Sequence, residues 1–162
     1  MRESLTVADA MATTLSEVGS SFEANELAYL ALTSKVELPI RDRLAWHLQF
    51  ALGDEYVVSR EWRRADIAVL RQNAPLVQVE AKAMYAFDLL SAKSRAKYLA
   101  KLTSDGHKMA SLAPSCDAYL LALVTHVDGS IATHLRQHVV KYSSGIRGAL
   151  SRQGSTRAEQ VA

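Results

Sequence analysis

The 162-residue sequence has one cysteine, three prolines and no long uninterrupted hydrophobic run. Cys116 has no second cysteine with which to form an internal disulfide, so a reducing cytoplasm is the expected location. No stretch approaches the roughly 18–20 apolar residues of a membrane helix. The first residues show no basic leader followed by an apolar segment. We therefore expect neither a membrane span nor a secretory signal.

Basic residues are scarce at the start of the chain. Residues 1–34 have one of the 19 bases and five of the 17 acids, so the remainder is modestly basic. Such a balance is compatible with a polyanionic partner. The length suits a single domain with a real core. We divide the chain into an N-terminal helical extension (1–34), a core (35–150) and a flexible polar tail (151–162).

Helical periodicity dominates the first third of the sequence. Apolar residues recur at helical spacing over 6–18 and 23–33, which we expect to form an accessory layer or a dimerisation surface. A further helix is predicted over Glu37–Leu52, with Pro39 in its first turn and Gly53 at its end.

The remaining elements alternate between strands and helices. Short runs rich in Val, Ile and Leu predict strands, and longer periodic segments predict helices. The expected elements are strands over Tyr56–Ser59, Ala65–Leu70 and Leu76–Ala81, a helix over Asp88–Leu112, a strand over Tyr119–Val127 and a helix over Ala132–Leu150. The strand Tyr119–Val127 is almost continuously apolar, which predicts burial on both faces.

Two of these strands form a predicted hairpin around the turn-like residues Arg71–Pro75. With those five residues as the loop, Leu70 faces Leu76, Ala68 faces Gln78 and Asp66 faces Glu80. Opposed side chains on one face of an antiparallel pair lie about 4.5–5.5 Å apart at Cβ.

Facing carboxylates repel each other unless a positive group lies between them. A divalent cation would fit between Asp66 and Glu80, and Lys82 lies two residues further on the same face as Glu80. Oxygen ligands suit Mg²⁺, which activates water and polarises phosphoryl oxygens. A nearby lysine positions that water or stabilises developing charge. The simpler alternative is a half-solvated strand with a surface Glu80–Lys82 ion pair.

Glu37 lies at the start of a predicted helix and has two interpretations of equal weight. An acid in a first helical turn favours the helix dipole, and Ser34-x-x-Glu37 matches a capping box. Alternatively, Glu37 projects from the end of the buried stripe of its helix as a catalytic acid.

The hairpin contains Asp66 and, after thirteen intervening residues, the tripeptide Glu80-Ala81-Lys82. This pattern resembles the signature of the PD-(D/E)xK nuclease superfamily. The order of elements over about residues 37–127 is similar to its restriction-endonuclease-like core, although Ala65 replaces the proline of the signature. The resemblance implies an α/β (α+β) fold with a central mixed four-stranded sheet flanked by helices, here with additional N-terminal helices. It also implies Mg²⁺, or Mn²⁺, bound by Asp66, Glu80 and the Ala81 carbonyl, with Lys82 as the catalytic lysine and Glu37 as a further acid.

Basic and aromatic residues supply candidates for contacts with DNA. Lys93, Lys97, Lys101 and Lys108 share one helix face, either as a solvated face or as a phosphate-binding track. The resemblance favours Lys93 and Lys97 for such a role. Arg64 is a further candidate, and Trp62 either stacks on a base or packs within the protein.

Three functions remain open from the sequence. The first is a metal-dependent endonuclease acting on DNA, structure-specific or within a repair, restriction or defence system, as a homodimer or with a partner protein. The second is a catalytically silent nucleic-acid-binding or assembly module on the same fold. The third is a purely structural hairpin in which Glu80 pairs with Lys82 or Arg64.

Overall fold

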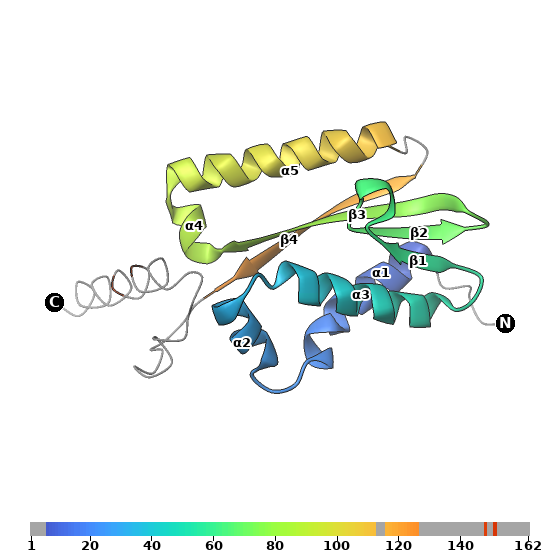
Figure 1. Cartoon of the computed structure of the whole chain (residues 1–162), viewed down its shortest axis with the longest axis horizontal. Coiled ribbons are helices and arrows are strands. Elements are labelled where there is room, and N and C mark those ends of the chain that lie inside the picture. The colour runs from blue at the N-terminus through green and yellow to red at the C-terminus, as the bar shows by residue number, and fades with distance from the viewer. Residues whose placement is uncertain (1–5, 113–115, 127–147, 149–150, 152–162) are drawn as a thin grey trace.

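The computed structural model describes residues 6–112, 116–126, 148 and 151. Nearly all of the helix predicted over Ala132–Leu150, and of the tail 151–162, lies outside these described residues. Within them the chain forms a four-stranded mixed sheet between two layers of helices (Figure 1). This arrangement confirms the mixed α/β class with a flanked four-stranded sheet.

The N-terminal segment forms helices close to those expected. The elements are α1 (Val7–Glu17), the 3₁₀ helix η1 (Val18–Ser21), α2 (Glu26–Thr33) and α3 (Glu37–Leu52). Thr6 and Asp9 form a reciprocal capping box at the start of α1. Helix α3 has the predicted bounds and ends at Gly53, whose φ of 71° is a conformation that glycine adopts without steric cost.

The sheet has the strand order β1-β2-β3-β4. Its strands are β1 (Val57–Arg60), β2 (Ile67–Arg71), β3 (Ala74–Tyr85) and β4 (Asp117–Thr125), and the 3₁₀ helix η2 (Trp62–Arg64) joins β1 to β2. The first three strands are antiparallel, whereas β4 is parallel to β3. Helices α4 (Ala86–Leu90) and α5 (Ala92–Leu112) form the connection that a parallel pair requires.

The β2–β3 hairpin has a tighter turn than the sequence predicted. Gln72 and Asn73 have φ values of 50° and 64°, and Arg71 pairs directly with Ala74, so the loop has two residues rather than five. Two left-handed residues match the twist of the flanking strands. Ala68 faces Gln78 as predicted. An irregularity between Val69 and Leu70 shifts the register, so Leu70 faces Pro75 and not Leu76.

The main core lies between the sheet and helices α1 and α3. Leu44 and Leu48 of α3 pack with Met11 of α1 against Val77 and Val79 of β3, all buried. Helix α5 runs along the opposite face of the sheet (Figure 1). The next residues of β3 therefore alternate between the α3 side and the α5 side, since strand side chains alternate in direction.

Two predictions about the second half of the chain are wrong. Strand β4 lies at an edge of the described sheet, and Leu120 and Val124 are 45% and 51% exposed, so it is not buried on both faces. An apolar run does not by itself specify which position in a sheet the strand occupies. The single helix predicted over Asp88–Leu112 is instead divided at Ser91 into α4 and α5. None of the described helices combines the length and the apolar composition needed to span a membrane.

Candidate active site

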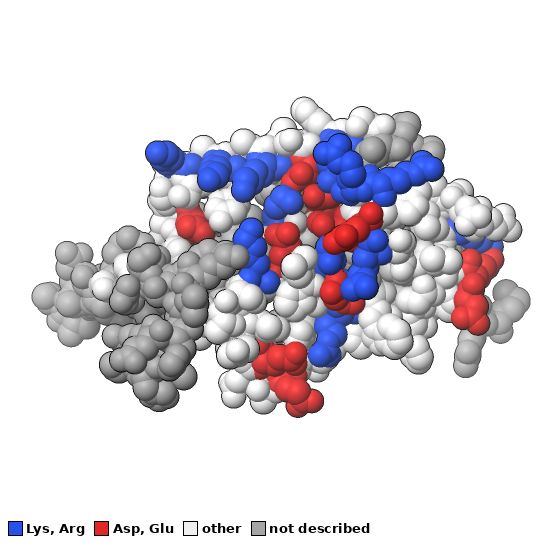
Figure 2. All heavy atoms as spheres, viewed as in Figure 1, with Lys and Arg blue, Asp and Glu red and all other residues white. Residues whose placement is uncertain are grey.

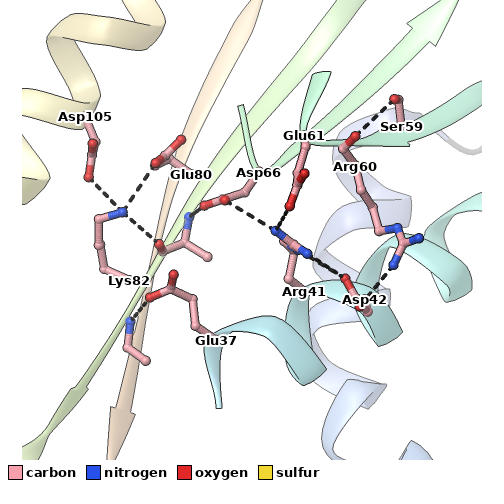
Figure 3. A network of polar contacts seen from close by, with 12 residues as sticks. Glu37, Arg41, Asp42, Ser59, Arg60, Glu61, Asp66, Glu80, Lys82 and Asp105 are labelled. Atoms are coloured by element: carbon pink, nitrogen blue, oxygen red, sulfur yellow. Dashed lines mark hydrogen bonds and ion pairs between the residues drawn. The ribbon is translucent and has the colours of Figure 1, made fainter. Parts of the chain in front are cut away.

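Strand β3 extends beyond its partner β2, and the predicted site lies along this extension. The last pair between the two strands is Ile67 with Val79, whereas β3 continues to Tyr85 and pairs with β4 throughout this stretch. In this stretch, the backbone N–H groups on the β2 side therefore have no strand partner among the described residues. Side-chain carboxylates take its place, as Figure 3 shows.

Asp66 occupies the position directly before β2. The register of the hairpin, extended by one residue, sets Asp66 opposite Glu80, as the sequence predicted. Its Oδ2 accepts a hydrogen bond from the Ala81 N–H at 2.7 Å. The other oxygen, Oδ1, lies 3.8 Å from Nη1 of Arg41. One oxygen is thus fixed by the backbone, and the other faces a cation only at a distance.

Glu37 reaches the same strand from the start of α3. Its Oε2 accepts a hydrogen bond from the Ala83 N–H at 2.9 Å. The capping box that the sequence offered as an alternative is absent, because Val36 is the N-cap residue and the Ser34 hydroxyl donates instead to the Leu30 carbonyl. The structure therefore brings Glu37 to the edge of β3 beside the predicted lysine.

Glu80 and Lys82 project towards α5. Glu80 is only 5% exposed, and its Oε1 lies 3.3 Å from Nζ of Lys82. The same ammonium group donates to the Ala81 carbonyl at 3.3 Å. Glu80 and Lys82 are thus paired, but within a covered region and not on an open surface.

Two side chains of α5 complete this ionic cluster. Asp105 Oδ2 lies 3.2 Å from Nζ of Lys82, and Nζ of Lys108 lies 2.9 Å from Oε2 of Glu80. All four side chains are at most 23% exposed. Buried charges require such pairing, since an unpaired ion away from water is costly. The two lysines and two carboxylates form a balanced quartet.

The environment of Lys82 keeps its ammonium charged. Burial lowers the pKa of Lys82, but the hydrogen bond to Asp105 and the charges of Glu80 and Asp105 outweigh burial, so the pKa lies above the ordinary 10.5. At neutral pH the group is a cation and a hydrogen-bond donor. It stabilises negative charge and does not accept a proton.

Arg41 anchors the other end of the site. Its guanidinium contacts Asp42 and Glu61 at 3.1 Å each, in addition to Asp66. Burial lowers the pKa of Arg41, and hydrogen bonds and charges of Asp42 and Glu61 more than offset this effect. Asp42 also pairs with Arg60 at 3.0 Å. The arginine thus holds the segment that leads into β2, and with it Asp66.

The donor chemistry of the site fits a hard cation. Every expected ligand is an oxygen atom, as Mg²⁺ and Mn²⁺ prefer. Two of the three, Glu80 Oε1 and the Ala81 carbonyl, already surround one positive group, the ammonium of Lys82. A metal there would be held by these two oxygens together with Asp66. In the part of the chain described, no three acidic, histidine or cysteine side chains are grouped as a ready-made metal site.

The predicted lysine row divides into three parts. Lys93 and Lys97 are exposed, Lys101 borders a pocket beside Lys82, and Lys108 turns inward to Glu80. Figure 2 shows basic side chains along α5, above a belt of mixed acidic and basic side chains. The expectation of four lysines on one solvent face is therefore wrong for Lys108.

Trp62 and Arg64 belong to the 3₁₀ helix η2, which directly precedes Ala65 and Asp66. The guanidinium of Arg63 stacks 4.6 Å from the ring centroid of Trp62, and Arg64 is exposed with a φ of 76°. Among the described contacts, neither Trp62 nor Arg64 bonds to the acids of the site, and Glu80 pairs with lysines rather than with Arg64.

Sequence reasoning missed Arg41 and Asp105, and it placed Lys108 in the lysine row without foreseeing its contact with Glu80. Arg41 follows Glu37 by four residues, which is the spacing of one helix face, and Asp105 precedes Lys108 by three. An acid within a lysine row was therefore a signal that this part of α5 faces a charged site.

Comparisons with protein-family models, curated proteins and solved structures found no match to this chain.

Proposed function

We propose that the protein is a metal-dependent nuclease that hydrolyses phosphodiester bonds of DNA on a restriction-endonuclease-like core of the PD-(D/E)xK type. One observation supports this proposal above all others. Glu37, Asp66, Glu80 and Lys82 belong to three segments, the start of α3, the residue before β2 and strand β3, and their polar contacts all meet on residues 80–83 of β3. A purely structural hairpin would not need this convergence.

The chain's own groups have separate tasks in this proposal. The Ala81 and Ala83 amides orient Asp66 and Glu37, which fixes each carboxylate by one of its oxygens. Lys82, charged at neutral pH, donates to the phosphate as negative charge develops. Asp105 keeps that ammonium in place. A bound Mg²⁺ or Mn²⁺ would polarise a phosphoryl oxygen and lower the pKa of a water molecule.

A cleavage panel tests the proposal. Linear, supercoiled, branched and single-stranded DNA are incubated with Mg²⁺ or Mn²⁺, using wild type, Glu80→Gln and Glu55→Gln. Glu55 is a matched control, because it is an exposed acid paired with Arg71 away from the site. We expect metal-dependent cleavage that Glu80→Gln abolishes and Glu55→Gln retains. Intact DNA with every substrate and both metals would refute catalysis.

A catalytically silent DNA-binding module is the second candidate, and one observation favours it. Each oxygen of Glu80 is paired with a lysine, Oε1 with Lys82 and Oε2 with Lys108. Such a module would bind DNA in a salt-sensitive manner. Its binding would be unchanged by EDTA, and Mn²⁺ titration calorimetry would show no heat of binding in wild type. Metal binding that disappears in Glu80→Gln would instead favour the nuclease.

A further inference from the structure

A small pocket adjoins the candidate active site at the far end of β3. It has a volume of about 80 Å³ and lies between the start of α3, the last residues of β3 and α5. Its lining includes Ser34, Lys35, Glu37, Lys82, Tyr98 and Lys101. About 10–15 Å³ on this measure is enough for one water molecule. The pocket therefore has room for a compact group of several atoms.

The charges around this pocket favour an anion. Among the described residues, Glu37 is the only acid that lines the pocket, and its carboxylate already accepts the Ala83 N–H. The ammonium of Lys82 is committed to Glu80 and Asp105. Lys35 and Lys101 are both exposed and have no carboxylate partner among the described ion pairs. Lys101 lies over the Tyr98 ring, 5.9 Å from its centroid.

Lys35 and Lys101 come from different elements and converge on one small space. Lys35 precedes α3, whereas Lys101 lies in the middle of α5. Two ammonium groups around a compact pocket suit a phosphate, because lysine binds phosphate as a point charge. Lys82 and Glu37 line both this pocket and the candidate site, so a phosphate bound here would neighbour the one at Lys82.

We infer that this pocket is a phosphate-binding subsite that holds a strand by the phosphate next to the bond to be cleaved. The inference rests on the proposed function for the identity of the strand. The phosphate has two possible sources, a terminal monoester or an internal diester. Both have the same chemistry towards Lys35 and Lys101, and strands with different ends separate them.

The experiment measures binding without cleavage. Fluorescence anisotropy in EDTA compares short single-stranded DNA with a 5′-phosphate, a 3′-phosphate or hydroxyl groups at both ends. The variant is Lys35→Gln with Lys101→Gln. The matched control is Arg71→Gln with Arg95→Gln, which removes the same charge from exposed residues that do not line the pocket. Circular dichroism melting checks that both variants fold.

We expect the pocket variant to weaken binding by about tenfold and the control to weaken it less, with the salt dependence reduced by about one unit of slope per lysine. Affinity that depends on one phosphorylated end, and is lost only in the pocket variant, assigns a terminal phosphate. The same specific loss without end dependence assigns an internal phosphate.

Equal losses in both variants would overturn the inference, because the lysines would then act only as diffuse positive charge. No loss in the pocket variant would overturn it as well. The result is separate from the proposed function, since binding in EDTA requires neither metal nor cleavage. If the protein binds DNA through the pocket but never cleaves it, the phosphate subsite is supported and the proposed nuclease activity is refuted.

Discussion

The two halves of β3 contrast in how their backbone is satisfied. Residues 74–79 pair with β2, so neighbouring backbone occupies that edge. Within the described part of the chain, residues 80–85 have no strand on that side, and the carboxylates of Asp66 and Glu37 accept the Ala81 and Ala83 N–H groups instead. The first half has hydrophobic side chains towards the core, whereas Glu80 and Lys82 of the second half belong to an ionic cluster.

This difference shows how a short strand creates a site. Buried N–H groups need acceptors, and a strand that ends early leaves some of them unpaired. A carboxylate that accepts such a bond is held in one orientation while its second oxygen stays available. Because β2 begins only at Ile67, the pairing with β3 stops there, and the free amides of β3 fix the two acids. Changes in the unpaired half should affect chemistry, and changes in the supporting residues should affect stability.

The largest expected effect concerns Lys82 in the unpaired half. Lys82→Met keeps the apolar stem but removes the ammonium, and we expect cleavage to fall by about 10²–10³-fold, as for loss of one charge-stabilising donor. Single-turnover rates at saturating metal would measure this. Arg71→Gln, at the hairpin turn, is the charge control. Equal rates in Lys82→Met and wild type would remove Lys82 from the proposed mechanism.

Arg41 provides the largest expected effect on stability. Its side chain is 9% exposed and has three acidic partners that are more exposed than itself. Removing one partner of a fully buried ion pair costs about 3–5 kcal/mol. Here water reaches the acidic partners and screens their charges, so the loss is smaller. We expect Arg41→Met to lower the free energy of unfolding by about 2 kcal/mol. Urea denaturation would measure it, and an unchanged midpoint would contradict an anchoring role.

Glu37 separates the two roles of a carboxylate in the unpaired half. Glu37→Ala leaves the Ala83 N–H without its acceptor and should cost about 1–2 kcal/mol of stability. Glu37→Gln retains an acceptor oxygen, so its stability should lie close to wild type. Both variants should slow cleavage if the charge of Glu37 serves the reaction. Normal cleavage in a stable Glu37→Gln would restrict Glu37 to holding the strand edge.

The sequence predicted the residues that define this site better than it predicted their surroundings. Asp66, Glu80 and Lys82 could be identified because strand alternation and one hairpin register place them together, and the register holds near Ala68 and Gln78. Glu37 was identified instead from its position at the start of the helix before the strands and from the family resemblance. The register fails near Leu70, since the left-handed conformations of Gln72 and Asn73 shorten the loop.

The tertiary partners of these acids could not be read from local spacing. Arg41, Asp105 and Lys108 belong to helices whose orientation against the sheet depends on packing of the whole domain. Lys108 continues the lysine row of α5 but points inward, because the buried Glu80 needs a second cation. The exposure of β4 depends likewise on its edge position, which its apolar sequence does not encode.

The smallest expected effect is the pH dependence of stability that Lys82 adds. Its pKa is raised in the folded protein above the ordinary 10.5, despite burial, by Asp105 and Glu80. Its stabilising contribution is therefore fully present below the unfolded pKa and is lost as pH rises through the folded pKa. Urea unfolding between about pH 9 and pH 11.5 should show wild type losing more stability than Lys82→Met, which has no ammonium there. Other lysines and tyrosines titrate in both proteins, so only the difference between the two curves reports on Lys82. Parallel curves would mean that Asp105 and Glu80 do not stabilise the charged form of Lys82, and the quartet on the unpaired half of β3 would then not be an energetic unit.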